Sequence, residues 1–173
     1  ERGTTMTAYI SRQLNYVDER GEVSHVGEQV LLTGNEPKVV LGEPGIGKTE
    51  LMRRVGDEPG FHYVTARAFI RQRPDQLAIP VGETWVIDAL DEDAAGREGD
   101  PAHQVLTRLS VLNCPNFILS CRSADWRAAL ARHDIREDYG VPPREYHLDP
   151  LSAEEAIGYL AEAIGLSRAQ KTV

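Results

Sequence analysis

The sequence has only two cysteines, no long apolar run and no excess of basic residues. Cys114 and Cys121 show no paired metal-ligand spacing, so we expect two reduced core residues and no zinc site. No stretch approaches the roughly 20 apolar residues that span a bilayer, and no basic-then-apolar leader begins the chain. A membrane protein is therefore not expected, and the predicted location is the cytoplasm.

The charge balance is acidic. The net charge is -8, with a pI near 5.1, which argues against a broad nucleic-acid surface because duplex binding depends on Lys and Arg. A single bound nucleotide is still compatible with this balance, since one loop, one lysine and one metal ion meet its charges locally.

With 173 residues, 41% of them hydrophobic, the chain can bury one core comfortably. Residues 1–36 are interpreted as a lead-in segment with a short helix at His25–Leu32, and residues 37–173 as the core domain. Because the chain begins with Glu1 and ends in the polar stretch Ser167–Val173, we expect a piece of a longer protein.

Short runs rich in β-branched and aromatic residues alternate with helical segments, which predicts βαβ units and an α/β fold with a parallel sheet. The predicted strands are Lys38–Leu41, Phe61–Thr65, Thr84–Ala89, Phe117–Cys121 and Glu145–Leu148. The predicted helices are Lys48–Arg54, Pro101–Leu112 with Asp100 as N-cap, Ser123–Arg132, and a closing helix from Ser152, with its capping box to Glu155, up to Gly165.

A phosphate-loop pattern, G-x-x-x-x-G-K-[ST], follows the first predicted strand and precedes a helix. It consists of Gly42, Glu43, Pro44, Gly45, Ile46, Gly47, Lys48 and Thr49, and Glu50 completes the predicted nucleotide-binding segment. Glycines let backbone N–H groups turn toward phosphate oxygens, and the helix directs its positive end to the same point. A dinucleotide-binding loop fits poorly, because Glu50 stands where its third glycine belongs.

Three side chains in and after this pattern are given metal or charge roles. Lys48 is expected to reach the β- and γ-phosphates, and the Thr49 hydroxyl to bind Mg²⁺. The apolar run that ends in Asp88 delivers a carboxylate at a strand end, which is typical of a second magnesium-binding motif.

Further polar residues follow the strand ends. Asp91 and Glu92 are candidate catalytic acids, with Glu92 as the base that activates water, although a charged solvated loop is the alternative. Arg122 follows the next strand and is placed to sense the γ-phosphate. The alternative interpretation is that Arg122 is a surface arginine at a strand end.

These residues resemble the NACHT-type branch of the STAND NTPases, of the kind found in bacterial defence proteins. The motifs that carry the resemblance are GEPGIGKT, WVIDALDE, FILSCRSADW and YHLDPLSAEEAIGYL. It implies a three-layer P-loop sandwich with five parallel strands ordered 2-3-4-1-5, in which the strand before Arg122 lies between the loop strand and the Asp88 strand. It also implies that Tyr9–Arg12 covers the adenine.

The functional implication is a slow ATPase that uses ATP, ADP and Mg²⁺ as a switch for self-association in signalling or antiviral defence. The helical and winged-helix parts of the family would lie beyond Val173. A second hypothesis for the function is a P-loop small-molecule kinase with a lid that contains Arg127, Arg132 and Arg136. A third is a module that binds nucleotide structurally, or only a protein partner. The trigger, the effector and the choice of ATP over GTP are not encoded in any motif.

Overall fold

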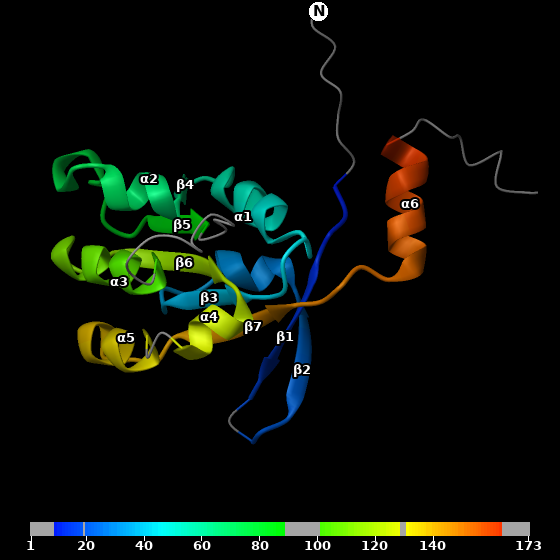
Figure 1. Cartoon of the computed structure of the whole chain (residues 1–173), viewed down its shortest axis with the longest axis horizontal. Coiled ribbons are helices and arrows are strands. Elements are labelled where there is room, and N and C mark those ends of the chain that lie inside the picture. The colour runs from blue at the N-terminus through cyan, green and yellow to red at the C-terminus, as the bar shows by residue number, and fades with distance from the viewer. Residues whose placement is uncertain (1–8, 19, 89–100, 129–130, 164–173) are drawn as a thin grey trace, which may run out of the picture.

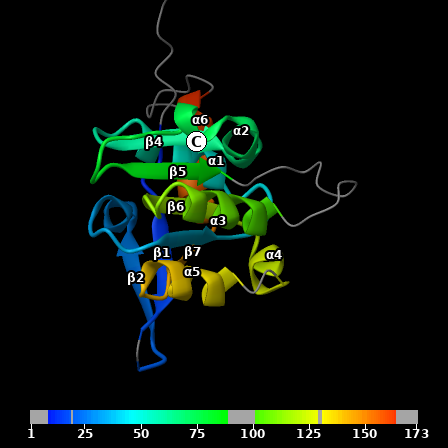
Figure 2. The same cartoon turned by 90° about the vertical axis from the view of Figure 1, so that its left-hand side faces the viewer.

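The computed structural model describes residues 9–18, 20–88, 101–128 and 131–163 (Figure 1). Asp91, Glu92 and Asp100, to which the sequence assigns roles, lie outside these ranges. The described backbone forms a seven-stranded sheet in the order β2-β1-β7-β3-β6-β5-β4. Figure 2 shows the strands stacked from β4 and β5 down to the β1–β2 hairpin.

The strands are β1 (Gln13–Val17), β2 (Val23–Gly27), β3 (Lys38–Leu41), β4 (Phe61–Thr65), β5 (Thr84–Asp88), β6 (Asn116–Cys121) and β7 (Arg144–Leu148). The α-helices are α1 (Lys48–Gly56), α2 (Ala66–Arg71), α3 (Pro101–Val111), α4 (Ser123–Ala128), α5 (Ala131–Tyr139) and α6 (Ala153–Ala163). Two 3-10 helices, η1 (Glu28–Leu32) and η2 (Pro74–Gln76), complete the described elements.

The strand count and the order of the whole sheet differ from the prediction. Five parallel strands succeed one another as β4-β5-β6-β3-β7, and β1 and β2 extend this sheet by antiparallel pairing of β1 with β7. The helix expected at His25–Leu32 is wrong: its first residues belong to β2, and the rest form η1. The segment taken as a lead-in therefore contributes two strands of the same sheet.

The β1–β2 hairpin is defined by its turn and by one buried side chain. The Asp18 carboxylate accepts the N–H groups of Arg20 and Glu22, each at 2.9 Å, and Gly21 has a φ of 82°, which favours glycine. Leu14 is fully buried in the core, whereas Val17 on the same strand is 61% exposed. One face of the hairpin thus packs on the domain and its tip is solvated.

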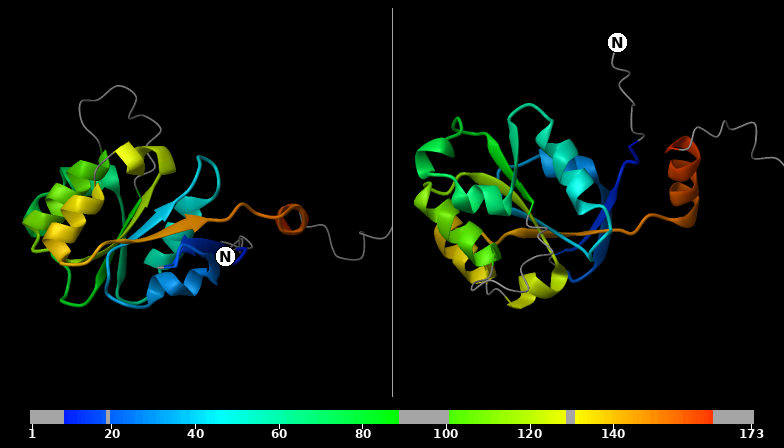
Figure 3. Two further views of the ribbon diagram at one scale, coloured as in Figure 1. Left: turned by 90° about the horizontal axis from the view of Figure 1, so that it is seen from below. Right: turned by 45° about the horizontal axis from the view of Figure 1, so that its top comes forward.

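Side chains of the central strands bury both faces of the sheet. In β3, Val39 and Leu41 join one core cluster and Val40 the other, and β5 and β6 alternate in the same way. The first cluster is completed by residues of α2, α3, α4 and α5, and the second by residues of α1, η1 and β1. The sheet is therefore a middle layer between two layers of helices (Figure 3).

The helices after β6 also correct the sequence analysis. The single helix expected at Ser123–Arg132 is two helices, α4 and α5, and the second continues to Tyr139. Helix α2 was not predicted either. Among the α5 residues whose burial is described, Ile135 is the only buried core residue, so this charge-rich segment has almost no apolar periodicity.

Helix α6 begins as the capping box predicts. The Ser152 N–H donates to the Glu155 carboxylate at 2.7 Å, and the Glu155 N–H donates to the Ser152 hydroxyl at 3.2 Å. The helix stands apart from the sheet (Figure 1), and Ile157 and Leu160 are 59% and 58% exposed. None of the described helices is long and apolar enough to cross a membrane.

The register of the parallel strands brings three strand ends together. Leu41, the last residue of β3, pairs with Cys121 of β6, and Asp88, the last residue of β5, pairs with Ser120. Because β6 lies between β3 and β5, the loop after Leu41 and the carboxylate of Asp88 are separated by a single strand. Parallel strands place these ends at one edge of the sheet.

A pair of substitutions in β1 tests whether the hairpin belongs to the core. Leu14→Ala should lower the free energy of unfolding by about 2–5 kcal/mol, because it leaves a cavity among buried side chains. Val17→Ala, on the exposed side of the same strand, should change it by no more than about 0.5 kcal/mol. Urea unfolding measures both, and equal small effects would contradict the packing of β1.

Candidate functional site

The loop between β3 and α1 has the backbone conformation that its glycines permit. Gly45 has a φ of 77° and Gly47 a φ of 100°, values that side-chain-bearing residues rarely adopt. Gly47 is the N-cap of α1, so the helix starts directly at the loop. The first N–H groups of a helix lack intrahelical partners and attract anions, which makes this junction suited to phosphate.

Lys48, the first residue of α1, turns its side chain back under the loop. Its ammonium group donates to the carbonyl oxygen of Gly42 at 2.5 Å and to that of Glu43 at 2.8 Å, and the residue is 1% exposed. Burial lowers the pKa of Lys48, and the nearby carboxylates of Asp88 and Glu43 oppose this shift. The negative charge of Asp88 thus favours the protonated form of Lys48.

Asp88 is the last residue of β5, and each of its two carboxylate oxygens accepts a hydrogen bond. Oδ1 accepts a hydrogen bond from the Ser120 hydroxyl, and Oδ2 accepts one from the Tyr63 hydroxyl at 3.4 Å. Burial raises the pKa of Tyr63, so the phenol stays a neutral donor. With Asp88 only 5% exposed, these two donors restrict the orientation of the carboxylate.

The other predicted site residues are distributed around this centre. Arg122 directly follows β6, is half-buried, and its positive charge contributes to lowering the pKa of Lys48. Thr49 is half-buried in the first turn of α1, next to the exposed Glu50. In the loop, Glu43, Pro44 and Gly45 are exposed, and Ile46 and Gly47 are half-buried. Asp91 and Glu92 lie outside the described residues.

One residue of the site was missed as a loop partner by the sequence analysis. Arg12, just before β1, is 6% exposed, and its guanidinium donates to the Ile46 carbonyl at 2.8 Å and to the Asp149 carbonyl at 2.6 Å. A lone arginine in a mixed polar segment gives no motif. The only sequence signal is the alternation that places Arg12 on the same side as the buried Leu14.

Tyr9, which the resemblance places over an adenine, has described contacts with two other residues. Its hydroxyl donates to the Glu28 carboxylate, and the Arg54 guanidinium carbon lies 4.3 Å from the centre of its ring. Burial and this hydrogen bond raise the pKa of Tyr9. Tyr9 thereby fastens the N-terminal segment to α1.

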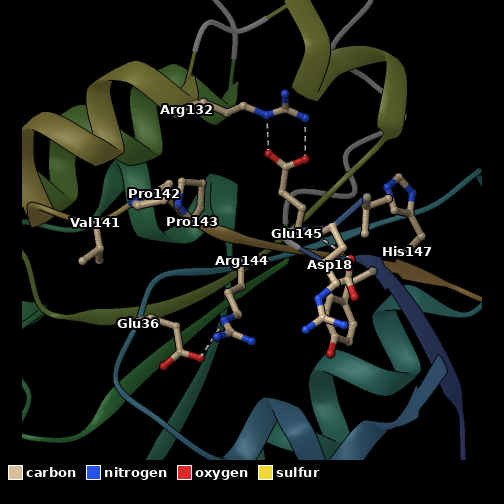
Figure 4. A pocket seen from close by; sticks show the side chains of 12 residues that line it. Asp18, Glu36, Arg132, Val141, Pro142, Pro143, Arg144, Glu145 and His147 are labelled. Carbon is tan, nitrogen blue, oxygen red and sulfur yellow. Dashed lines mark hydrogen bonds and ion pairs between the residues drawn. The ribbon is translucent and has the colours of Figure 1, made fainter. Parts of the chain in front are cut away.

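A pocket of about 940 Å³ lies elsewhere, toward the amino ends of β3 and β7 (Figure 4). Four of the charged side chains that line it form two ion pairs. Arg132 makes a two-pronged ion pair with Glu145, and Arg144 lies 3.7 Å from Glu36. The loop follows the carboxyl end of β3, and neither Lys48 nor Asp88 lines this pocket.

Comparisons with known proteins leave the family open. No protein-family model matches the chain, and no curated protein matches it. Among solved structures, the chain is similar to AMPPCP-bound DnaA from Aquifex aeolicus, with a TM-score of 0.49 and 16% sequence identity over 81% of this chain and 49% of that one. The chain thus spans about half the length of that protein, and likeness at this level does not decide function.

Removing the hydroxyl that donates to Asp88 tests whether Ser120 orients this carboxylate for the predicted binding of magnesium. Ser120→Ala should raise the Mg²⁺ concentration needed for half-maximal magnesium-dependent nucleotide binding about tenfold, since the carboxylate loses a group that orients it. Affinity for nucleotide in the presence of a chelator should stay near that of the unsubstituted protein. Ser110→Ala, on the exposed side of α3, is the control. An unchanged magnesium dependence in Ser120→Ala would contradict the role of Ser120 in orienting Asp88.

Proposed function

We propose that this chain binds Mg-ATP at the loop Gly42–Thr49 and hydrolyses it slowly. The observation that carries the proposal is the buried ammonium of Lys48, held by two loop carbonyls at the start of α1. A lysine of this kind is a mobile point charge that can exchange carbonyl partners for phosphate oxygens. ATP is preferred to GTP because no guanine-reading pattern is present in the sequence.

Each group has a distinct task in this proposal. The N–H groups of the loop from Gly45 onward donate to phosphate oxygens, and Lys48 neutralises the β- and γ-phosphates. Thr49 and Asp88 would hold the magnesium ion, because magnesium prefers hydroxyl, carboxylate and water oxygens. The ion would neutralise charge on the phosphates. The residues present fit both groups, because the Thr49 hydroxyl lies in the first turn of α1, the Asp88 carboxylate ends β5, and only β6 separates β5 from the loop strand β3.

Hydrolysis is assigned to residues that follow the strand ends. Glu92, with Asp91 beside it, takes a proton from the attacking water, and Arg122 stabilises charge on the γ-phosphate. Support for Arg122 comes from its position after β6, next to both the loop strand and the Asp88 strand. Support for Asp91 and Glu92 comes from their sequence spacing after Asp88.

We further propose that the chain is the switch module of a larger STAND-type NTPase. In that role its nucleotide state governs self-association in signalling or antiviral defence. The support is the acidic pair after Asp88, together with the NACHT-like motifs. The small-molecule kinase has less support, because Arg132, one of its three lid candidates, is ion-paired with Glu145.

Replacing Lys48 tests the nucleotide site. Lys48→Ala should weaken ADP and ATP binding about a hundredfold or more, because the phosphates lose their main charged side-chain partner. Isothermal titration calorimetry measures the affinity, and Lys38→Ala, at the other end of β3, controls for removal of a buried lysine. Equal affinity in Lys48→Ala and the unsubstituted protein would rule out the loop as the binding site.

Replacing Glu92 in the full-length protein tests hydrolysis and the switch together. Glu92→Gln should bind ATP normally, release phosphate at least tenfold more slowly, and accumulate the self-associated form when ATP is present. Phosphate release and light scattering after size-exclusion chromatography measure these effects. Unchanged hydrolysis would remove Glu92 from the role of base. One oligomeric state with ATP, ADP and the trigger would end the switch proposal, and phosphate transfer to a small acceptor would indicate the kinase.

A further inference from the structure

Arg12 joins three segments that are far apart in the sequence. Its backbone N–H donates to the Glu28 carboxylate at 2.9 Å, which holds the residue against the start of η1. Its guanidinium contacts the phosphate loop at Ile46 and the connection after β7 at Asp149. With 6% of the residue exposed, these contacts lie inside the folded protein and are not a solvated surface interaction.

The second partner of Arg12 is itself fixed. The Asp149 N–H donates to the Gln13 carbonyl at 3.0 Å, and the Asp149 carboxylate accepts from the Asn15 amide at 2.5 Å. The two partners of Asp149, Gln13 and Asn15, both belong to β1, the strand that Arg12 precedes. The guanidinium is therefore anchored to the sheet on one side, and on the other side it holds the loop.

Gly47 leaves room for the Arg12 guanidinium and is also the N-cap of α1. A Cβ atom at Gly47 would clash with Nη1 of Arg12, so a larger residue there would have to displace the guanidinium. The φ of 100° at Gly47 gives the same residue a second, independent reason to be glycine. The loop and Arg12 thus fit each other closely at this peptide.

The bond to the Ile46 carbonyl has a geometric consequence. In a planar trans peptide, the C=O of one residue and the N–H of the next point in opposite directions. No cis peptide bond occurs in the described chain, so the Gly47 N–H points away from Arg12 when the guanidinium holds the Ile46 oxygen. A rotation of this peptide would break that hydrogen bond.

We propose that Arg12 is a positioning residue that locks the Ile46–Gly47 peptide so that the Gly47 N–H is presented to a nucleotide phosphate. This inference rests on the proposed nucleotide site. Arg12 need not touch the nucleotide, and the group that binds phosphate is the backbone amide it orients. Preorganised donors bind more strongly than donors that must first rotate into place, so the effect belongs to binding of the phosphate chain.

The test compares affinity for ADP in three forms of the full chain. Arg12→Ala should bind ADP about tenfold more weakly, because the Gly47 N–H, a donor to the charged phosphate, is no longer held in place. Arg20→Ala removes the same charge from the exposed hairpin turn and should bind ADP as the unsubstituted protein does. Unfolding by urea, measured in parallel, separates loss of stability from loss of affinity in the folded fraction.

The amide signal of Gly47 provides a readout that a purely structural role would not move. In the unsubstituted protein, ADP should shift the Gly47 N–H resonance strongly, as expected for a new hydrogen bond to phosphate, and this shift should be much smaller in Arg12→Ala. Should Arg12→Ala fail to fold, a Gly47 amide that does not respond to ADP in the unsubstituted protein still overturns the proposal. Equal ADP affinity in Arg12→Ala and Arg20→Ala overturns it too.

These outcomes are distinct from failure of the proposed function. If neither the unsubstituted protein nor Arg20→Ala binds ADP, the nucleotide site itself is wrong, and the inference about Arg12 falls with it. If both bind ADP and only the Arg12 comparison shows no difference, the nucleotide site stands and the role of Arg12 alone is refuted.

Discussion

The burial of the Lys48 ammonium is the constraint on which the rest of the site depends. Removing such a charge from water costs several kcal/mol unless polar partners replace its hydration. Here the carbonyl oxygens of Gly42 and Glu43 supply these partners, and the Asp88 carboxylate supplies opposite charge nearby. A loop that bends enough to offer its carbonyls requires glycine, and a carboxylate close to it requires the strand order of the sheet.

The parallel sheet meets the second requirement through a single strand. β6 lies between the loop strand and the Asp88 strand, and its own residue Ser120 donates to Asp88. The same strand leads to Arg122, so β6 both orients the acidic group and places after it a cation whose charge acts on Lys48. The site is thus built from the ends of adjoining strands, and the helical layers stabilise those strands from both faces.

The sequence predicted the parts of this arrangement that local patterns determine. The loop pattern, the five parallel strands and the capping box at Ser152 each consist of neighbouring residues whose chemistry is readable within a short window. The β1–β2 hairpin was missed because its strands are short and because Leu14 is the only fully buried residue in them, with Tyr16 and Val26 only partly buried against the core. α5 was missed for a related reason, since Ile135 is its only described core residue.

Arg12 shows what local patterns could not supply. The two partners of its guanidinium, Ile46 and Asp149, lie 34 and 137 residues away along the chain. Nothing in the neighbourhood of Arg12 indicates either of them, because the contacts arise only when β1 pairs with β7 beside the loop strand. The N-terminal segment therefore changes from a lead-in to a support for the loop once the sheet is assembled.

The most direct measurement is an experimental structure of the chain with Mg²⁺ and a non-hydrolysable ATP analogue. We expect the β-phosphate to lie against the backbone between Gly45 and Lys48, and the metal ion to lie between Thr49 and Asp88. An analogue bound in the pocket lined by Arg132 and Glu145, with the loop empty, would contradict this expectation.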